Sequence, residues 1–134
     1  MSARPGTVRR DLFTESYAQN AHAIAEGATL LHGFAAGAAP SLLQAIEDVV
    51  AAAPLRHMIT PGGYRMSVAM TNCGSLGWVS DRTGYRYDRI DPESGFGWPE
   101  MPESFLKLAT GAAERAGYTR YTPDACLINR YEPG

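Results

Sequence analysis

Residues 60–87, TPGGYRMSVAMTNCGSLGWVSDRTGYRY, are the stretch that decides the expected fold. A proline and two glycines near its start are typical of a tight turn. From Tyr64 to Asn72, larger apolar side chains alternate with small or polar ones, and this period of two predicts a strand. Further extended segments are predicted at 76–80 and 85–87, with a glycine-bearing turn between them. The stretch therefore predicts a small sheet that carries aromatic side chains.

Outside this stretch, the sequence predicts two helices and two more strands. One helix spans 40–53, where apolar residues recur every three or four positions and a proline follows the last of them. The second spans 102–116 and is followed by a glycine, the residue most common just after a helix. Alternating segments at 28–32 and 125–131 predict strands. Strands mixed with two helices, without an internal repeat, predict an α/β or an α+β fold; the family resemblance given below implies α+β.

Composition narrows the possible functions. The chain has 134 residues, of which 45% are hydrophobic, so it can bury the core of one domain. A net charge of −2 argues against a generally basic nucleic-acid binder. Between Arg56 and Arg89, however, five arginines and two aspartates give a local net charge of +3. This local charge indicates either a partner that carries phosphates or an accidental cluster on a solvated surface.

Motifs for catalysis are missing from this sequence. The histidines lack the spacing to a carboxylate that iron or zinc sites use, and they are His22, His32 and His57. No phosphate-binding glycine loop and no nucleophile elbow occurs. Cys73 and Cys126 do not form a CxxC pair, so we expect free thiols in a reducing cytosol. No secretory signal or membrane span is evident. We therefore assign no catalytic and no metal-ligating residue.

Binding features are stronger. Aromatic side chains on neighbouring extended segments can stack on a planar base, and a cationic base adds a cation–π attraction; these side chains are Tyr64, Trp78, Tyr85 and Tyr87. Arginines interleaved with them could meet phosphates, and they are Arg65, Arg82 and Arg86. The alternative is that the aromatic residues fill a small core. Asn129 and Tyr131 would suit a bound carboxylate, or would simply face water on an edge strand.

Five segments resemble the AlkB family of Fe(II)- and 2-oxoglutarate-dependent DNA repair dioxygenases. They are MITPGGYRMSVAMTNCGSLGW at 58–78, GYRY at 84–87, IDP at 90–92, WPEMP at 98–102 and PDACLINRYEPG at 123–134. The resemblance begins near Ala28, and we expect residues 1–27 to form a flexible N-terminal arm. It implies that residues 28–121 form a support and a nucleotide-recognition lid of strands and two helices. Residues 122–134 would then begin a double-stranded β-helix, or jelly-roll, dioxygenase domain.

The resemblance also implies roles for particular residues. Those of the alkylated-base pocket and its surroundings are Trp78, Tyr85, Arg86, Tyr87 and Met70. The turn that begins with Thr60 and ends with Tyr64 would touch the nucleic-acid backbone. Residues that contact 2-oxoglutarate or shape its site are Leu127, Asn129, Arg130 and Tyr131.

The implied activity is oxidative demethylation of bases such as 1-methyladenine and 3-methylcytosine, which consumes 2-oxoglutarate and O₂ at Fe(II) and releases formaldehyde. The base must be single-stranded or flipped out of a duplex. The substrate would be alkylated single-stranded DNA or RNA, and the enzyme a cytoplasmic monomer. Because the HxD and distal histidine of the family would lie beyond Gly134, we expect this chain not to bind iron or turn over. The alternatives are a non-catalytic module that binds alkylated or single-stranded nucleic acid, and a dioxygenase relative that acts on protein side chains.

Overall fold

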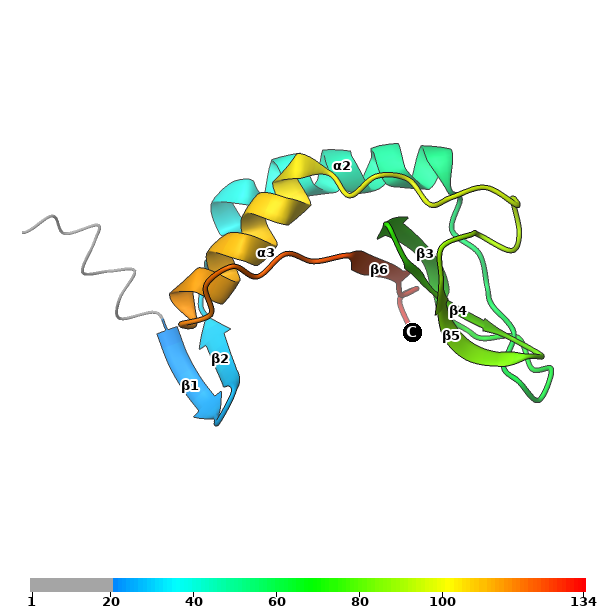
Figure 1. Ribbon diagram of the computed structural model, residues 1–134, viewed down its shortest axis with the longest axis horizontal. Helices are drawn as coiled ribbons and strands as arrows, with labels where there is room; N and C mark the ends of the chain where they lie inside the picture. Colours follow the sequence, from blue (N-terminus) through cyan, green and yellow to red (C-terminus); the bar gives the residue numbers. More distant parts are fainter. Residues whose placement is uncertain (1–20) are drawn as a thin grey trace, which may run out of the picture. The chain divides into compact units, whose positions relative to one another are not determined.

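The computed structural model describes residues 21–134 and divides the chain into two compact units, Met1–Ala36 and Gly37–Gly134. In the first, β1 (Ala21–Ala25) and β2 (Ala28–Leu31) form an antiparallel hairpin (Figure 1). Strand β2 was predicted, but β1 lies in the range 1–27 that was expected to be a flexible arm. For residues 21–25 that expectation is corrected, and residues 1–20 lie outside the described part. All five β1 residues are exposed, so no alternating pattern marked the strand.

Two α-helices belong to the second unit, as the sequence predicted. Helix α2 (Ala39–Ala52) follows a short 3₁₀ turn, η1 (Ala36–Ala38), and has proline in its first turn, where the missing N–H has no intrahelical partner to lose. Its buried residues are Ala45 and Val49. Helix α3 (Glu103–Arg115) is followed by Gly117, whose φ of 93° is in the left-handed region. No residue of α3 is fully buried, so its predicted inner face is only half covered.

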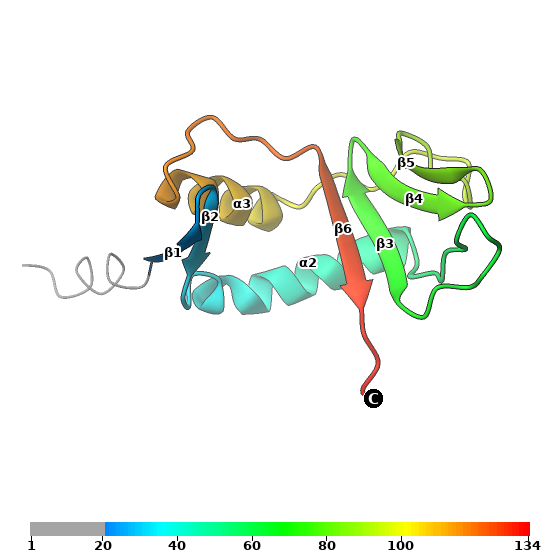
Figure 2. The ribbon, with the colours of Figure 1, turned by 90° about the horizontal axis from the view of Figure 1, so that it is seen from below.

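Strands β3 (Ala69–Gly74) and β6 (Ala125–Arg130) pair antiparallel, with Met70 opposite Asn129. Helix α2 lies across this pair (Figures 1 and 2), and the Thr71 hydroxyl donates a hydrogen bond of 2.7 Å to the carbonyl of Ala53. Residues 122–134 lie in the same compact unit as the helices and strands that precede them from Gly37.

The predicted strand from Tyr64 is shorter in the structure, where β3 begins at Ala69. Only an isolated bridge between Ile59 and Arg65 pairs the residues before it. Without a partner strand along its length, the segment 64–68 cannot form a ladder. Both faces of β3 are buried from Ala69 to Cys73. The alternation of larger and smaller side chains therefore separates the two faces of the strand, but neither face is exposed to solvent.

Strands β4 (Gly77–Asp81) and β5 (Gly84–Asp88) form a second antiparallel hairpin. Val79 of β4 packs with Ala53 and Trp98 in the core. The Trp98 indole N–H donates a hydrogen bond of 3.0 Å to the carbonyl of Asp88, and this contact anchors the loop before α3. A Cβ at Gly77 would overlap the Trp98 ring, so this close approach requires glycine. In the described part of the chain, no helix combines the length and the apolar character that a membrane crossing requires.

Candidate functional site

The central feature of the candidate site is an aromatic pair on the β4–β5 hairpin. The rings of Trp78 and Tyr85 stack with centroids 5.7 Å apart and planes inclined by 16°. Pairing places Trp78 opposite Tyr87 and Ser80 opposite Tyr85, so the stacked residues are diagonal neighbours across the hairpin. Because the rings are already in contact, a planar ligand would stack on an outer ring face rather than between them.

The other tyrosines of this region are on the surface and not in a core. The exposed fraction is 62% for Tyr85, 63% for Tyr87 and 77% for Tyr64. The alternative that these aromatic residues fill a small core is therefore wrong for all three. The aromatic residue that does enter the core is Trp98, which is 8% exposed.

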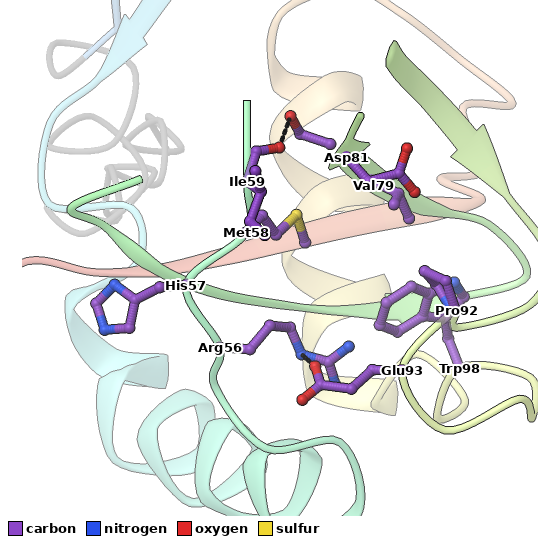
Figure 3. Close-up of a pocket in the computed structure, with 10 residues that line it drawn as sticks. Arg56, His57, Met58, Ile59, Val79, Asp81, Pro92, Glu93 and Trp98 are labelled. Carbon is purple, nitrogen blue, oxygen red and sulfur yellow. Dashed lines mark hydrogen bonds and ion pairs between the residues drawn. The ribbon is translucent and has the colours of Figure 1, made fainter. Parts of the chain in front are cut away.

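The turn at Thr60 and Tyr64 is held beside β4. The Thr60 N–H donates to the Tyr64 carbonyl at 2.8 Å, and the Tyr64 N–H donates to the Thr60 hydroxyl at 3.1 Å. The Ser80 hydroxyl in turn donates to the Ile59 carbonyl at 2.7 Å, which attaches the segment before the turn to the strand that carries Trp78 (Figure 3). The guanidinium of Arg82 lies next to Gly63. The structure thus brings the predicted backbone-contact turn close to the aromatic hairpin.

Arg86 does not lie beside Trp78 and Tyr85, where the resemblance led us to expect it. It alternates with Tyr85 and Tyr87 along β5 and pairs with Val79, so its side chain leaves the opposite face of the hairpin. Its guanidinium lies 3.0 Å from an oxygen of Asp81 and 3.2 Å from one of Asp88. The structure therefore does not bring Arg86 together with the stacked rings.

Hydrogen bonds around Arg86 also shift the pKa values of the Asp81 and Asp88 carboxylates. Hydrogen bonds from Thr83 and then from Arg86 lower the pKa of Asp81. The backbone N–H of Ile90 and then Arg86 lower the pKa of Asp88. Within residues 21–134, by contrast, Arg65 and Arg82 are exposed and form no ion pair with a carboxylate. Both guanidinium groups therefore remain available to phosphates.

A pocket of about 310 Å³ lies behind the hairpin (Figure 3), and it is not lined by Trp78 or Tyr85. At its wall, Arg56 lies 2.6 Å from Asp91, 3.2 Å from Glu93 and 5.3 Å from the centre of the Trp98 ring. Burial raises the pKa of Asp91, but the hydrogen bond and charge of Arg56 outweigh this and hold it below its ordinary value. Arg56 and Glu93, which both line the pocket, are thus paired with each other, and Arg56 is also paired with the buried Asp91.

The predicted carboxylate-binding residues share one face of β6. Leu127 and Asn129 alternate with residues that face α2, and the Asn129 amide donates to the Tyr131 hydroxyl at 3.3 Å. Tyr131 is 71% exposed and Leu127 is 39% exposed. Met70 is the cross-strand neighbour of Asn129 and is 3% exposed. Four of the predicted residues thus lie together, with an amide and a phenol as hydrogen-bond donors.

Arg130, the middle residue of the predicted Asn-Arg-Tyr group, does not join this face. It stands opposite Ala69, on the face that also carries Ile128, and its guanidinium lies 3.3 Å from a carboxylate oxygen of Glu132. Alternation along a strand separates it from Asn129 and Tyr131, so only the outer two residues of the group can meet one ligand.

Two cysteines occupy directly opposite positions on β3 and β6, and both are free thiols. The thiol of Cys73 interacts with that of Cys126 and lowers the pKa of Cys126 to about 7. The same interaction, together with burial, raises the pKa of Cys73. The pair lies on the face of the strands opposite to Asn129.

The sequence analysis missed one residue of this region, Asn72. Its side chain is fully buried, its amide donates to the Trp78 carbonyl at 2.9 Å, and its oxygen accepts from the Trp78 N–H at 2.9 Å. A buried amide must find partners for both its donor and its acceptor. An asparagine within a strand was therefore the available signal, but the sequence could not name its partner.

The chain resembles known proteins over most of its length. The sequence pattern of the 2OG-Fe(II) oxygenase superfamily matches residues 27–134. The chain is 56% identical over 111 residues to the alpha-ketoglutarate-dependent dioxygenase AlkB of Escherichia coli (strain K12), and 55% identical over 111 residues to that of Salmonella typhimurium. Each alignment covers 83% of this chain and 51% of the relative.

A homologue of AlkB from Caulobacter vibrioides is 44% identical over 94 residues, which is 70% of this chain and 41% of that protein. The chain spans about half the length of the curated relatives it matches. It belongs to the 2OG-Fe(II) oxygenase superfamily and, within it, to the AlkB family. The resemblance inferred from five short segments is thereby confirmed.

Membership of this superfamily implies Fe(II) and 2-oxoglutarate, and the residues fit the two unequally. Among residues 21–134, no group of three or more His, Cys, Asp or Glu side chains is placed to hold a metal ion. The described residues thus do not fit an iron centre. The donors of Asn129 and Tyr131 do fit a carboxylate, because both lie on an exposed strand face.

Proposed function

We propose that this protein recognises N-alkylated bases in single-stranded nucleic acid, as part of a dioxygenase that removes the alkyl group by oxidation. Residues 28–121 would form the support and the nucleotide-recognition lid, and residues 122–134 the start of the jelly-roll dioxygenase domain. The observation that carries the proposal is the stacked pair of Trp78, which is half-buried, and Tyr85, which is exposed. The relatives' names call them alpha-ketoglutarate-dependent dioxygenases, and we extend that dependence to this protein.

The aromatic pair suits a base such as 1-methyladenine or 3-methylcytosine because alkylation makes the base cationic. Stacking of a base on an aromatic side chain contributes about 1–3 kcal/mol. A positive charge over the ring adds about 0.5–2 kcal/mol, which an unmodified base does not gain. This difference gives a preference for the lesion, and Tyr87 and Met70 complete the surroundings of the base.

The backbone of the substrate would follow the turn beside the hairpin. Thr60 and Tyr64 present a hydroxyl and an exposed phenol there, and Arg82 lies next to the turn. The proposal leaves Arg86 in a structural role because two carboxylates already bind it. Single-stranded substrate suits this surface, since a base inside a duplex would first have to leave its stack.

The cosubstrate would bind at the exposed face of β6. Its carboxylate would accept hydrogen bonds from the Asn129 amide and the Tyr131 hydroxyl, with Leu127 against its methylene groups. For a methylated base, oxidation with 2-oxoglutarate and O₂ releases formaldehyde. Because the described residues do not fit iron, we assign no step of the oxidation to them.

The test is a binding comparison with short single-stranded DNA that contains one 1-methyladenine or one adenine at the same position, followed by fluorescence anisotropy. We expect the 134-residue chain to bind the methylated strand more tightly. Tyr85→Ala and Trp78→Ala should abolish the preference. Tyr118→Ala is the matched control, because Tyr118 is exposed to a similar extent, 55%, but lies after α3. Equal affinity for both strands, unchanged in Trp78→Ala, would refute the proposal.

A further inference from the structure

Asn72 occupies the junction between the two sheets of the second unit. The β3–β6 pair and the β4–β5 pair are separate two-stranded sheets, and no backbone ladder joins β3 to β4. The N–H and the carbonyl of Trp78 are the groups that a neighbouring strand would bind. Both are instead bound by the side-chain amide of Asn72, at 2.9 Å each. The amide therefore takes the place of a peptide group in a strand that is not there.

Asn72 lies on the same face of β3 as Met70, and this face contacts both proposed binding sites. Asn72 stands opposite Leu127, and Met70, two residues earlier on the same face, stands opposite Asn129. One face of β3 thus contacts the residues proposed for 2-oxoglutarate and, through Asn72, the backbone of the residue proposed for the base. With an exposed fraction of 0%, Asn72 has no solvent to replace either hydrogen bond.

We propose that Asn72 is a positioning residue that sets where the Trp78 ring stands relative to the cosubstrate face of β3 and β6. The inference rests on the proposed base-binding function of the Trp78–Tyr85 pair. Two hydrogen bonds, one to the N–H and one to the carbonyl of Trp78, fix the position of the β4 backbone at that residue relative to β3. Removing the Asn72 amide takes away the hydrogen bonds between β3 and the backbone of Trp78, while the pairing of β4 with β5 stays intact.

The experiment compares Asn72→Ala with Thr71→Val. Thr71 is the matched control because it is equally buried and its hydroxyl also donates one internal hydrogen bond, but to Ala53 on the helix side. A second variant replaces Trp78 by its α-hydroxy acid analogue, which removes the N–H that Asn72 accepts from, keeps the Trp78 side chain, and also makes the Gly77 carbonyl a weaker acceptor. The readouts are the near-ultraviolet circular dichroism of the stacked aromatic pair and the affinity for the 1-methyladenine strand.

We expect Asn72→Ala and the ester variant to lose the circular dichroism signal of the stack and to bind the methylated strand about tenfold more weakly. Thr71→Val should retain both. The inference is overturned if Asn72→Ala keeps signal and affinity, or if Thr71→Val loses as much. If Asn72→Ala does not fold, the ester variant decides on the same criteria. If the unaltered chain shows no preference for the methylated strand, the proposed function fails, and the spectroscopic comparison still decides the role of Asn72.

Discussion

Replacing Arg56 by alanine is expected to destabilise the protein far more than removal of an ordinary surface charge. The Arg56 side chain is 14% exposed and lies 2.6 Å from the carboxylate of Asp91, which is 3% exposed. Its charge also lies 5.3 Å from the centre of the Trp98 ring. The substitution leaves the Asp91 carboxylate buried with the Glu93 N–H as a remaining partner.

The magnitude follows from these contacts. Removing one partner of a buried ion pair costs about 3–5 kcal/mol, mainly because the remaining charge is left unpaired. Loss of the cation–π contact adds about 0.5–2 kcal/mol, and the retained N–H of Glu93 offsets part of the total. We therefore expect Arg56→Ala to lower the free energy of unfolding by about 3–5 kcal/mol, a large part of the 5–15 kcal/mol typical of a domain.

The assay is urea unfolding followed by tryptophan fluorescence in a Trp78→Phe background, so that the signal reports Trp98 alone. Lys107→Ala is the control, because Lys107 forms an ion pair with Glu103 in which the side chains are 76% and 81% exposed. That pair should contribute about 0.3–0.5 kcal/mol. The prediction is wrong if the free energy of unfolding falls in Arg56→Ala by no more than about 1 kcal/mol beyond its fall in Lys107→Ala. The buried pair would then not hold this loop.

Two further predictions concern titration. Against the effect of burial, Arg56 holds the pKa of Asp91 below its ordinary value in the folded protein, so Asp91 contributes stability above its unfolded pKa of about 3.9. This contribution is lost as the pH falls through the folded pKa. Below about pH 4, the free energy of unfolding should therefore fall less steeply with pH in Asp91→Asn than in the unaltered chain. Because the pKa of Cys126 is about 7, iodoacetamide at neutral pH should label Cys126 well before the buried Cys73, as measured by peptide mass spectrometry. Equal labelling rates would contradict the second prediction.

The spacing of apolar residues was sufficient to predict both helices and the strand β6. Helix α2 has an apolar stripe bounded by prolines, and α3 ends at a glycine, so local chemistry fixed both. The hairpin strand β1 was not predictable because none of its side chains is buried, and an exposed strand carries no alternating signal. The start of β3 was misplaced for a related reason, since its length depends on where β6 stops pairing.

The candidate site was predictable in its residue types but not in its contacts. Aromatic residues on glycine-linked strands indicated stacking, and the resemblance to the AlkB family pointed to the same residues. The register of the hairpin then decided that Tyr85 stacks on Trp78 and that Arg86 faces away. Register and tertiary partners depend on pairing between distant segments, so neither was visible in a local pattern. The two hydrogen bonds of Asn72 to Trp78 are also tertiary contacts, so a local pattern could not predict them.

The junction at Asn72 also has a consequence for how such proteins diverge. A backbone ladder transmits any inserted residue along the strands, because a slip of one residue turns every side chain to the other face. No backbone ladder joins the β4–β5 hairpin to β3, so a residue gained or lost at the tip of the hairpin leaves the pairing of Met70 with Asn129 unchanged. On the proposed function, mutation can vary the recognised lesion in the hairpin while descendants inherit the cosubstrate face intact.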